Sequence, residues 1–362
     1  MKAIKLFLSA ILLLSVSQIQ ADNFSADEFT IAAGEKKTIN INLTNSRTIY
    51  GFQFSLYLPT GVSITTRTSG AYKITGNSNR LFNWTVASNF DSEKGCYIIG
   101  AGGLDAIEET SGAILSIEIT ASDQIDTREN KVYIKQQKIT INKANGDPVT
   151  IDADETITES PCTLQINAKI GSSGYCSFSW PRALDFSNCQ NCENVFIAKD
   201  QGNNYVKISS LNNKLVPANT GVLIKGTPGD VVHPQTTDNA GTIDNNLFIP
   251  TSEGTFTVPK KGDAWALAVK SGKTGFYPCE AGVVIPQYKC YLPASVSAKS
   301  FIMIKQENPD EDLVSEDAGI IDGINTVNGN DAQDTYYDLQ GRRVSTARHG
   351  IYIQNNKKVI IK

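Results

Sequence analysis

The sequence predicts an all-β protein made of two β-sandwich-like domains, an acidic linker and a short C-terminal β segment. The first reason is the stretch YGFQFSLYL (50–58), in which large apolar side chains occupy every second position. Alternate side chains of a strand point to opposite faces, so these residues share one side and Tyr57 lies on the other. The second reason is that many similar short runs follow, separated by Gly, Asn and Ser clusters and without a long helical period.

The N-terminus has the composition of a secretory signal peptide. Lys2 and Lys5 precede an apolar run over residues 6–16, and the segment ends at the small residue Ala21. A basic start, a short apolar centre and a small residue at the end are typical of such leaders, so we expect cleavage between Ala21 and Asp22. The apolar run is shorter than the about 20 residues that a membrane-spanning helix needs. The sequence has no second long apolar run, and no transmembrane segment is expected.

Charge and length limit the class of partner and the number of domains. Loss of Lys2 and Lys5 with the leader takes the net charge from −4 to −6. A net negative chain argues against nucleic acid as partner, and against an anionic membrane surface. The remaining chain is long enough for two domains at roughly 100–200 residues each.

The predicted domains follow the distribution of β signals and charge. Residues 22–157 form the first sandwich, and residues 161–305 form a second β-rich domain to which the sequence assigns no function. Residues 306–335 are an acidic linker, since residues 307–334 hold nine Asp or Glu and no Lys or Arg. Residues 336–362 form a β tail.

The first domain resembles the cohesin family. The segments that carry the resemblance are, in chain order, TININLT, YGFQFSLYLPTGV, GLDAIEETSGAILSIEIT and KITINKANGDPVTI. The resemblance covers residues 22–157 and implies a jelly-roll sandwich, related to carbohydrate-binding modules, that binds either a dockerin-type protein module or polysaccharide. The sequence contains no dockerin-type calcium loop with acidic residues at alternate positions, so we expect the chain to be the receiver.

The C-terminal tail resembles the sorting signal of the type IX secretion pathway. The resemblance rests on DLQGRRV, which contains Gly341 and Arg342, on the GIY that begins at Gly350, and on the terminal KVIIK. It implies that the outer-membrane export machinery is a partner. It also implies that the protein is secreted or displayed on the outer face of a Gram-negative outer membrane.

Seven cysteines are distributed unevenly along the chain. Cys96 stands alone in the first half and is expected to be a buried free thiol. The other six cysteines form an even group, which in an exported chain favours disulfides. The sequence leaves their pairing open among 15 arrangements. The six candidates are Cys162, Cys176, Cys189, Cys192, Cys279 and Cys290. Cys189 and Cys192 form a C-x-x-C in a polar loop, which favours a structural disulfide over a redox site, since the latter needs a helix N-terminus.

The sequence offers no catalytic residue, cofactor site or metal site. Its only histidines are His233, which precedes a proline in a loop, and His349, which lies in the tail. Neither has a neighbouring nucleophile motif, and the cysteine spacing does not match a zinc site. We therefore predict that the protein is not an enzyme.

Aromatic residues are the candidates for ligand binding. Trp84 lies between the polar residues Asn83 and Thr85, and Tyr57 points away from the apolar side of its strand. Aromatic rings with a polar group suit binding to sugars or to proteins. The alternative for Trp84 is that it fills the sandwich core.

The function predicted from these features is a secreted, non-catalytic surface protein that binds polysaccharide or a dockerin-type partner, in connection with polysaccharide utilisation. One alternative is a structural or adhesive surface protein in which the sandwiches act as spacers. A hydrolase or thiol oxidoreductase is the other.

Overall fold

A computed structural model describes residues 22–108, 110–142, 147–152, 156–202, 204–294 and 300–306, together with four strands beyond residue 335. Every regular element in these residues is a β-strand, so the all-β prediction is confirmed. The chain divides into two compact units, Met1–Pro309 and Asp310–Lys362. Within the described residues no helix could span a membrane.

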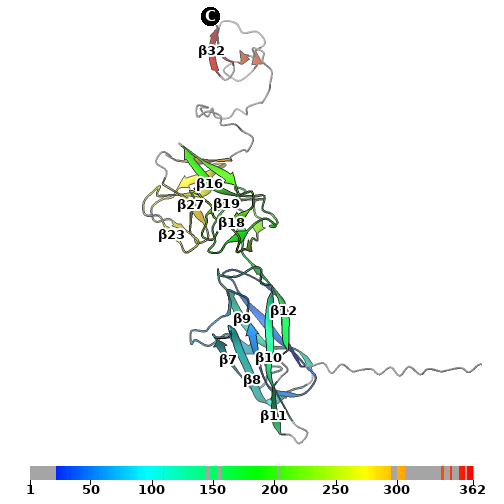
Figure 1. The fold of residues 1–362 in the computed structure, drawn as a ribbon. Coiled ribbons are helices and arrows are strands. Elements are labelled where there is room, and N and C mark those ends of the chain that lie inside the picture. Colours follow the sequence, from blue (N-terminus) through cyan, green and yellow to red (C-terminus); the bar gives the residue numbers. More distant parts are fainter. Residues whose placement is uncertain are drawn as a thin grey trace, which may run out of the picture. The chain divides into compact units, whose positions relative to one another are not determined.

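The N-terminal part is a sandwich of two sheets (Figure 1). The first sheet has the order β1 (Asn23–Ala26), β3 (Lys36–Asn45), β9 (Thr110–Ala121), β5 (Val62–Ile64), and β6 (Ile74–Gly76) also pairs with β9. The second has the order β2 (Phe29–Ala32), β12 (Ile157–Gln165), β10 (Lys131–Asn142), β4 (Ile49–Tyr57), β8 (Cys96–Ile107), β7 (Trp84–Asp91), and β11 (Pro148–Asp152) also pairs with β10. We call these two sheets the first sandwich.

The alternation in β4 builds the core of the first sandwich as predicted. Phe52, Phe54 and Leu56 are at most 4% exposed, whereas Tyr50 and Leu58 at the strand ends are half-buried. The Phe24 ring of the opposite sheet packs against Phe52 and Phe54, with ring centroids 5.3 and 5.0 Å apart. Burial of each large apolar side chain stabilises the fold by roughly 1.5–3 kcal/mol. This central strand, held between β10 and β8, therefore anchors the second sheet.

The next part of the unit is organised around one large mixed sheet. Its order is β14 (Tyr175–Phe178), β19 (Val222–Lys225), β16 (Asn194–Gly202), β17 (Tyr205–Ser210), β28 (Ile302–Gln306), β25 (Lys273–Pro278), β24 (Ala264–Lys270), β27 (Cys290–Pro293), β22 (Ile249–Pro250). Three small sheets accompany it, formed by β13 (Ala168–Lys169) with β20 (Val231–Val232), by β18 (Leu215–Val216), β15 (Leu184–Asp185) and β21 (Gln235–Thr236), and by β23 (Phe256–Thr257) with β26 (Val284–Ile285).

Strand β12 belongs to the first sandwich along its whole length, and only residues 166 and 167 separate it from β13. Residues 157–161 pair with β10, and residues 162–165 pair in parallel with β2. The position at which the sequence suggested a domain boundary therefore lies inside a strand of the first sandwich.

A buried carboxylate joins the loop after β9 to the following part of the unit. Asp126 is 6% exposed and accepts hydrogen bonds from Arg128, from Arg182 Nη2 at 2.9 Å and from Thr236 Oγ1 at 2.6 Å. Arg128 also pairs with Asp238. These charge-assisted bonds, first of all those from Arg128, hold the pKa of Asp126 far below its usual range.

The second unit contains a four-stranded antiparallel sheet in the order β30 (Arg343–Val344), β29 (Tyr336–Tyr337), β31 (Gly350–Gln354), β32 (Lys357–Ile361). Gly350 begins β31. The expected leader up to Ala21, the linker beyond residue 306, and the sorting-signal residues Gly341 and Arg342 lie outside the described residues.

Candidate functional site

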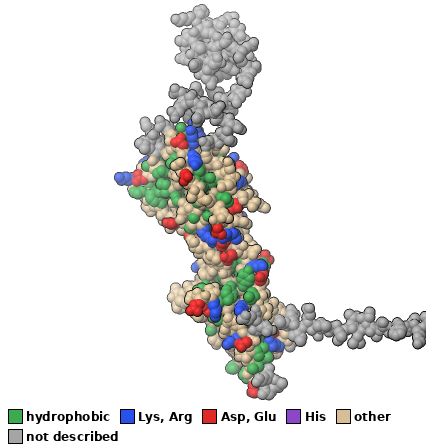
Figure 2. Space-filling model, in the orientation of Figure 1, with side chains coloured by type: hydrophobic (Ala, Val, Ile, Leu, Met, Phe, Trp, Pro, Cys, Tyr) green, Lys and Arg blue, Asp and Glu red, His purple; other side chains and the backbone are tan. Residues whose placement is uncertain are grey.

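The outward face of the second sheet is the broadest candidate surface on the first sandwich. By this outward face we mean the side of β12, β10, β4, β8 and β7 that points away from the core. Strand register brings together on it Tyr57, Ile98, Gly100, Gly102, Tyr133, Lys135 and Ile157. Leu104 follows two residues after Gly102, beyond Gly103, the last residue of β8 that pairs with β7, and side-chain alternation along β8 places it on the same side. Figure 2, in the orientation of Figure 1, shows apolar side chains lying among charged ones over these strands.

Three of these apolar side chains are well exposed. Leu104 is 93% exposed, Ile157 57% and Tyr133 39%. Tyr133 and Ile157 lie on the neighbouring strands β10 and β12, whereas Leu104 lies on β8, on the other side of β4. Apolar groups gathered on one face and bordered by polar residues are a feature of protein-binding surfaces. Sequence reasoning missed all three. The available signal was an apolar residue at the position that alternation assigns to the outside, as with Tyr133 between buried Val132 and Ile134.

Two glycines leave the middle of the outward face without side chains. A Cβ on Gly100 would lie 3.5 Å from Phe52 O, and one on Gly102 would lie 3.6 Å from Tyr50 O, which are ordinary contact distances. Neither glycine has a positive φ. The fold would thus accept alanine at both positions, so packing does not require glycine there. Glycine is also the less stable choice, because it weakens a strand. Glycine inside a strand often marks a place where another molecule approaches closely.

Tyr57 lies on the outward face, at the end of β4. Its direct partner on β10 is Tyr133, and Cys96, at the start of β8, interacts with its phenol. Burial, and then the neighbouring Cys96 thiol, raise the pKa of Tyr57. Its phenol is therefore protonated at neutral pH and can donate a hydrogen bond to a partner.

Trp84 lies on the opposite side of the same sheet. Its ring packs against Phe52 with centroids 5.8 Å apart, and its Nε1 donates to Asp105 O at 2.6 Å. The indole also occupies the space next to Gly103, where a Cβ would clash with it. Trp84 is thus half-buried and packed against the core, which is the alternative that the sequence left open. The two aromatic candidates do not form one surface.

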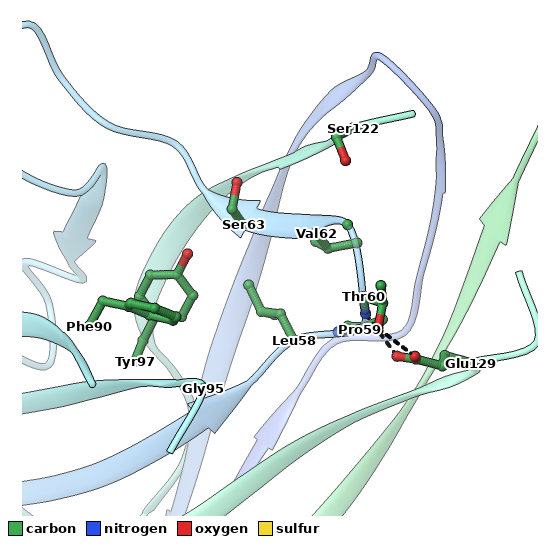
Figure 3. A pocket seen from close by; sticks show the side chains of 11 residues that line it. Leu58, Pro59, Thr60, Val62, Ser63, Phe90, Gly95, Tyr97, Ser122 and Glu129 are labelled. Atoms are coloured by element: carbon green, nitrogen blue, oxygen red, sulfur yellow. Dashed lines mark hydrogen bonds between the residues drawn. The ribbon is translucent and has the colours of Figure 1, made fainter. Parts of the chain in front are cut away.

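A pocket of about 480 Å³ lies where the two sheets of the first sandwich meet near β5 and β7 (Figure 3). The rings of Phe90 and Tyr97, whose centroids are 4.9 Å apart, form one side. On the other side the Glu129 carboxylate accepts hydrogen bonds from Thr60 N at 2.8 Å and Thr60 Oγ1 at 2.7 Å. Both carboxylate oxygens are therefore engaged in holding the turn after β4. No catalytic pair of side chains lines this pocket.

The cysteines do not form the expected disulfide framework. All seven, Cys96, Cys162, Cys176, Cys189, Cys192, Cys279 and Cys290, are described and are free thiols. Cys96 is fully buried, as predicted. Two of the others donate to backbone carbonyl groups: Cys290 Sγ to Val222 O at 3.3 Å, and Cys189 Sγ to His233 O at 3.2 Å.

The C-x-x-C thiols also lack the electrostatics of a redox site. Burial, and then the neighbouring Cys192, raise the pKa of Cys189 to about 12, and burial raises the pKa of Cys192. Thiol–disulfide chemistry needs a thiolate, and hence a lowered pKa. The described residues contain no group of three or more His, Cys, Asp or Glu that could hold a metal ion.

Comparison with known proteins finds likeness only among solved structures. No family model and no curated protein matches the chain. The matching structures are cohesin domains, the family that the sequence resembles. They include a non-cellulosomal cohesin from Archaeoglobus fulgidus, with 12% identity over 40% of this chain and 90% of that chain at a TM-score of 0.29. A type I cohesin of ScaB from Pseudobacteroides cellulosolvens has 15% identity over 40% of this chain and 91% of that chain, at a TM-score of 0.29. A type II cohesin from Acetivibrio cellulolyticus has 19% identity over 39% of this chain and 94% of that chain, at a TM-score of 0.27.

Proposed function

We propose that the protein is a non-catalytic binding protein that captures a folded protein module on the outward face of its first sandwich. The observation that carries this proposal is that one face combines Tyr133 and Ile157, exposed on the neighbouring strands β10 and β12, with Gly100, Gly102 and the exposed Leu104 on β8. The glycines allow a partner to approach the backbone, and Leu104, Tyr133 and Ile157 provide apolar contacts around them.

The shape of the site supports a macromolecular partner. A small molecule is normally enclosed in a concave pocket, whereas the outward face is the side of a sheet and spans five strands. A protein interface buries about 800 Å² on each partner. A face of five strands, spaced about 4.8 Å apart, can supply an area of that order.

The class of partner that we propose is a dockerin-type module. The reason is the sequence resemblance of residues 22–157 to cohesins. Polysaccharide is the alternative ligand, but Trp84, one of the two rings predicted to bind a ligand, is packed against Phe52 and Gly103. Secretion and surface display belong to the same proposal, supported by the leader and tail sequences. The cell surface is where a polysaccharide-utilising system would need such a receiver.

The test is a binding assay between the purified chain and a panel of purified dockerin modules, with a polysaccharide array as the second arm. Gly102→Arg adds bulk to the outward face at a position where a Cβ fits. We expect it to weaken module binding by about tenfold or more, which corresponds to about 1.4 kcal/mol. Thr38→Arg, on an exposed position of β3 in the other sheet, is the matched control.

Three results distinguish the alternatives. Module binding that is lost in Gly102→Arg and kept in Thr38→Arg supports the proposal. Binding that both variants keep would place the site elsewhere, and the outward face would be excluded. Retention of polysaccharide without module binding would favour the alternative ligand, while no binding in either arm would leave a spacer role.

A further inference from the structure

Strand β7 is an unusually long free edge in the first sandwich. It has eight residues and, among the described strands, pairs only with β8. The sandwich's other edge strands are short, with four residues in β1 and β2 and three in β5 and β6. Strand β11 begins with Pro148, which cannot donate a backbone hydrogen bond. Short strands and prolines are devices that protect a sheet edge from pairing with another chain.

None of these protective devices is present in β7. Its first seven residues, WTVASNF, include no charged residue and no proline. Its register with β8 is continuous from Trp84 opposite Gly103 to Asp91 opposite Cys96, so no bulge bends the edge away. Ala87, Ser88, Asn89 and Phe90 are consecutive exposed residues, which shows that no described segment covers this end of the strand. An uncharged, regular and exposed edge is suited to addition of a further strand.

We propose that β7 pairs antiparallel with β7 of a second copy of this chain, with Ala87 opposite Ala87. We choose a second copy as the partner because the residues on the two sides of Ala87 match each other when the strand pairs with itself. In this register Trp84 lies opposite Phe90, Thr85 opposite Asn89, and Val86 opposite Ser88. Directly opposite residues in an antiparallel pair point to the same side.

The aromatic pair agrees with the side on which these rings already lie. Trp84 packs against Phe52, and Phe90 packs against Tyr97, so both rings are on the core side of their sheet. The proposed register thus places an indole beside a phenyl ring that is 41% exposed in the single chain. Aromatic pairs of this kind stabilise strand pairing.

Charge and side-chain direction disfavour the neighbouring registers. A shift by one residue would place Trp84 opposite Asp91 and would bring the core side of one copy next to the outward side of the other. The centred register leaves every charged residue outside the paired segment 84–90. It joins the second sheets of two copies into one continuous sheet that carries two outward faces.

The test is site-directed cross-linking of the purified chain together with its mass in solution. Ala87→Cys should form a disulfide-linked dimer on mild oxidation, because residue 87 meets its own equivalent. Thr85→Cys is the matched control, since it is exposed on the same strand but lies opposite Asn89. Wild-type protein, oxidised in parallel, measures the background from its seven native thiols. Mixing Thr85→Cys with Asn89→Cys should restore cross-linking.

The second measurement is sedimentation equilibrium. We expect a wild-type dimer, and about tenfold or greater weakening by Ala87→Lys, which places two like charges opposite each other. Thr38→Lys should not change the mass, and circular dichroism checks that both variants fold. A monomeric wild-type protein would overturn the proposal. So would a dimer that Ala87→Lys leaves intact, or equal linking of Ala87→Cys and Thr85→Cys.

Discussion

The indole of Trp84 occupies the volume that a side chain on Gly103 would need. The two residues lie opposite each other on β7 and β8, and the indole Nε1 donates to Asp105 O two residues further along β8. This arrangement fixes the ring on the core side of the sheet. Packing therefore explains why residue 103 is glycine. It does not explain Gly100 and Gly102, where a Cβ would meet no close neighbour.

Replacement of Gly103 by alanine should therefore destabilise the first sandwich. The added methyl forces the Trp84 ring to move, and overpacking of this kind costs about 1–3 kcal/mol. The measurement is urea-induced unfolding followed by tryptophan fluorescence. Gly100→Ala is the matched control and should change the free energy of unfolding by less than about 0.5 kcal/mol. Equal effects of the two variants would contradict the packing described for Trp84.

Substitutions of Trp84 and Tyr57 should differ in their effects, the first lowering stability and the second mainly weakening binding. Trp84→Ala removes a ring packed against Phe52 and should lower the free energy of unfolding by about 2 kcal/mol or more. Tyr57→Ala should lower it by less, and should weaken binding of the partner module by about 1 kcal/mol or more if the residue lies at the centre of the contact. Unfolding curves and titration calorimetry measure the two quantities. A Tyr57→Ala variant with unchanged affinity would exclude that end of β4 from the interface.

Asp126 should make stability depend on pH in the acidic range. Its pKa in the folded protein is lowered, whereas an unfolded Asp has a pKa of about 3.9. The stabilisation is therefore fully present above that unfolded value and is lost as the pH falls towards the folded value. Asp126→Asn should cost about 1–3 kcal/mol at pH 7.

The stabilisation by the wild-type carboxylate is lost in acid. The difference in free energy of unfolding between wild type and Asp126→Asn should therefore shrink between about pH 5 and pH 2. Denaturation midpoints at a series of pH values give this difference. Glu159→Gln is the control, since Glu159 forms an exposed ion pair with Lys131 on the surface. A difference that stays constant with pH would show that the Asp126 network does not stabilise the fold through its charge.

Cys189 should react slowly with alkylating reagents. Since its pKa is raised to about 12, almost none of the thiol is ionised at pH 8, and the thiolate is the reactive form. Alkylation by iodoacetamide should be far slower in the native protein than in denatured protein, and should accelerate as the pH rises. Comparison with Cys189→Ser assigns the signal. Rapid alkylation at pH 8 would revive the thiol oxidoreductase alternative.

Local pattern was sufficient to predict the central strand of the first sandwich. Alternation in residues 50–58 correctly placed Phe52, Phe54 and Leu56 in the core, because the period of two is a property of the strand itself. It also placed Tyr57 on the other side. The same reasoning could not decide on which side Trp84 lies, because its strand carries no clear alternation and its position depends on Phe52 and Gly103.

The sequence by itself determined that this protein is all-β and that Phe52, Phe54 and Leu56 share the buried side of one strand, since side-chain alternation is encoded within each strand. Only the tertiary structure decided which strands are neighbours. It thereby brought Tyr133 and Ile98 onto one face and left β7 as a free edge. The physical reason is that strand pairing depends on hydrogen bonds and packing between residues far apart in the chain, and no local spacing records them.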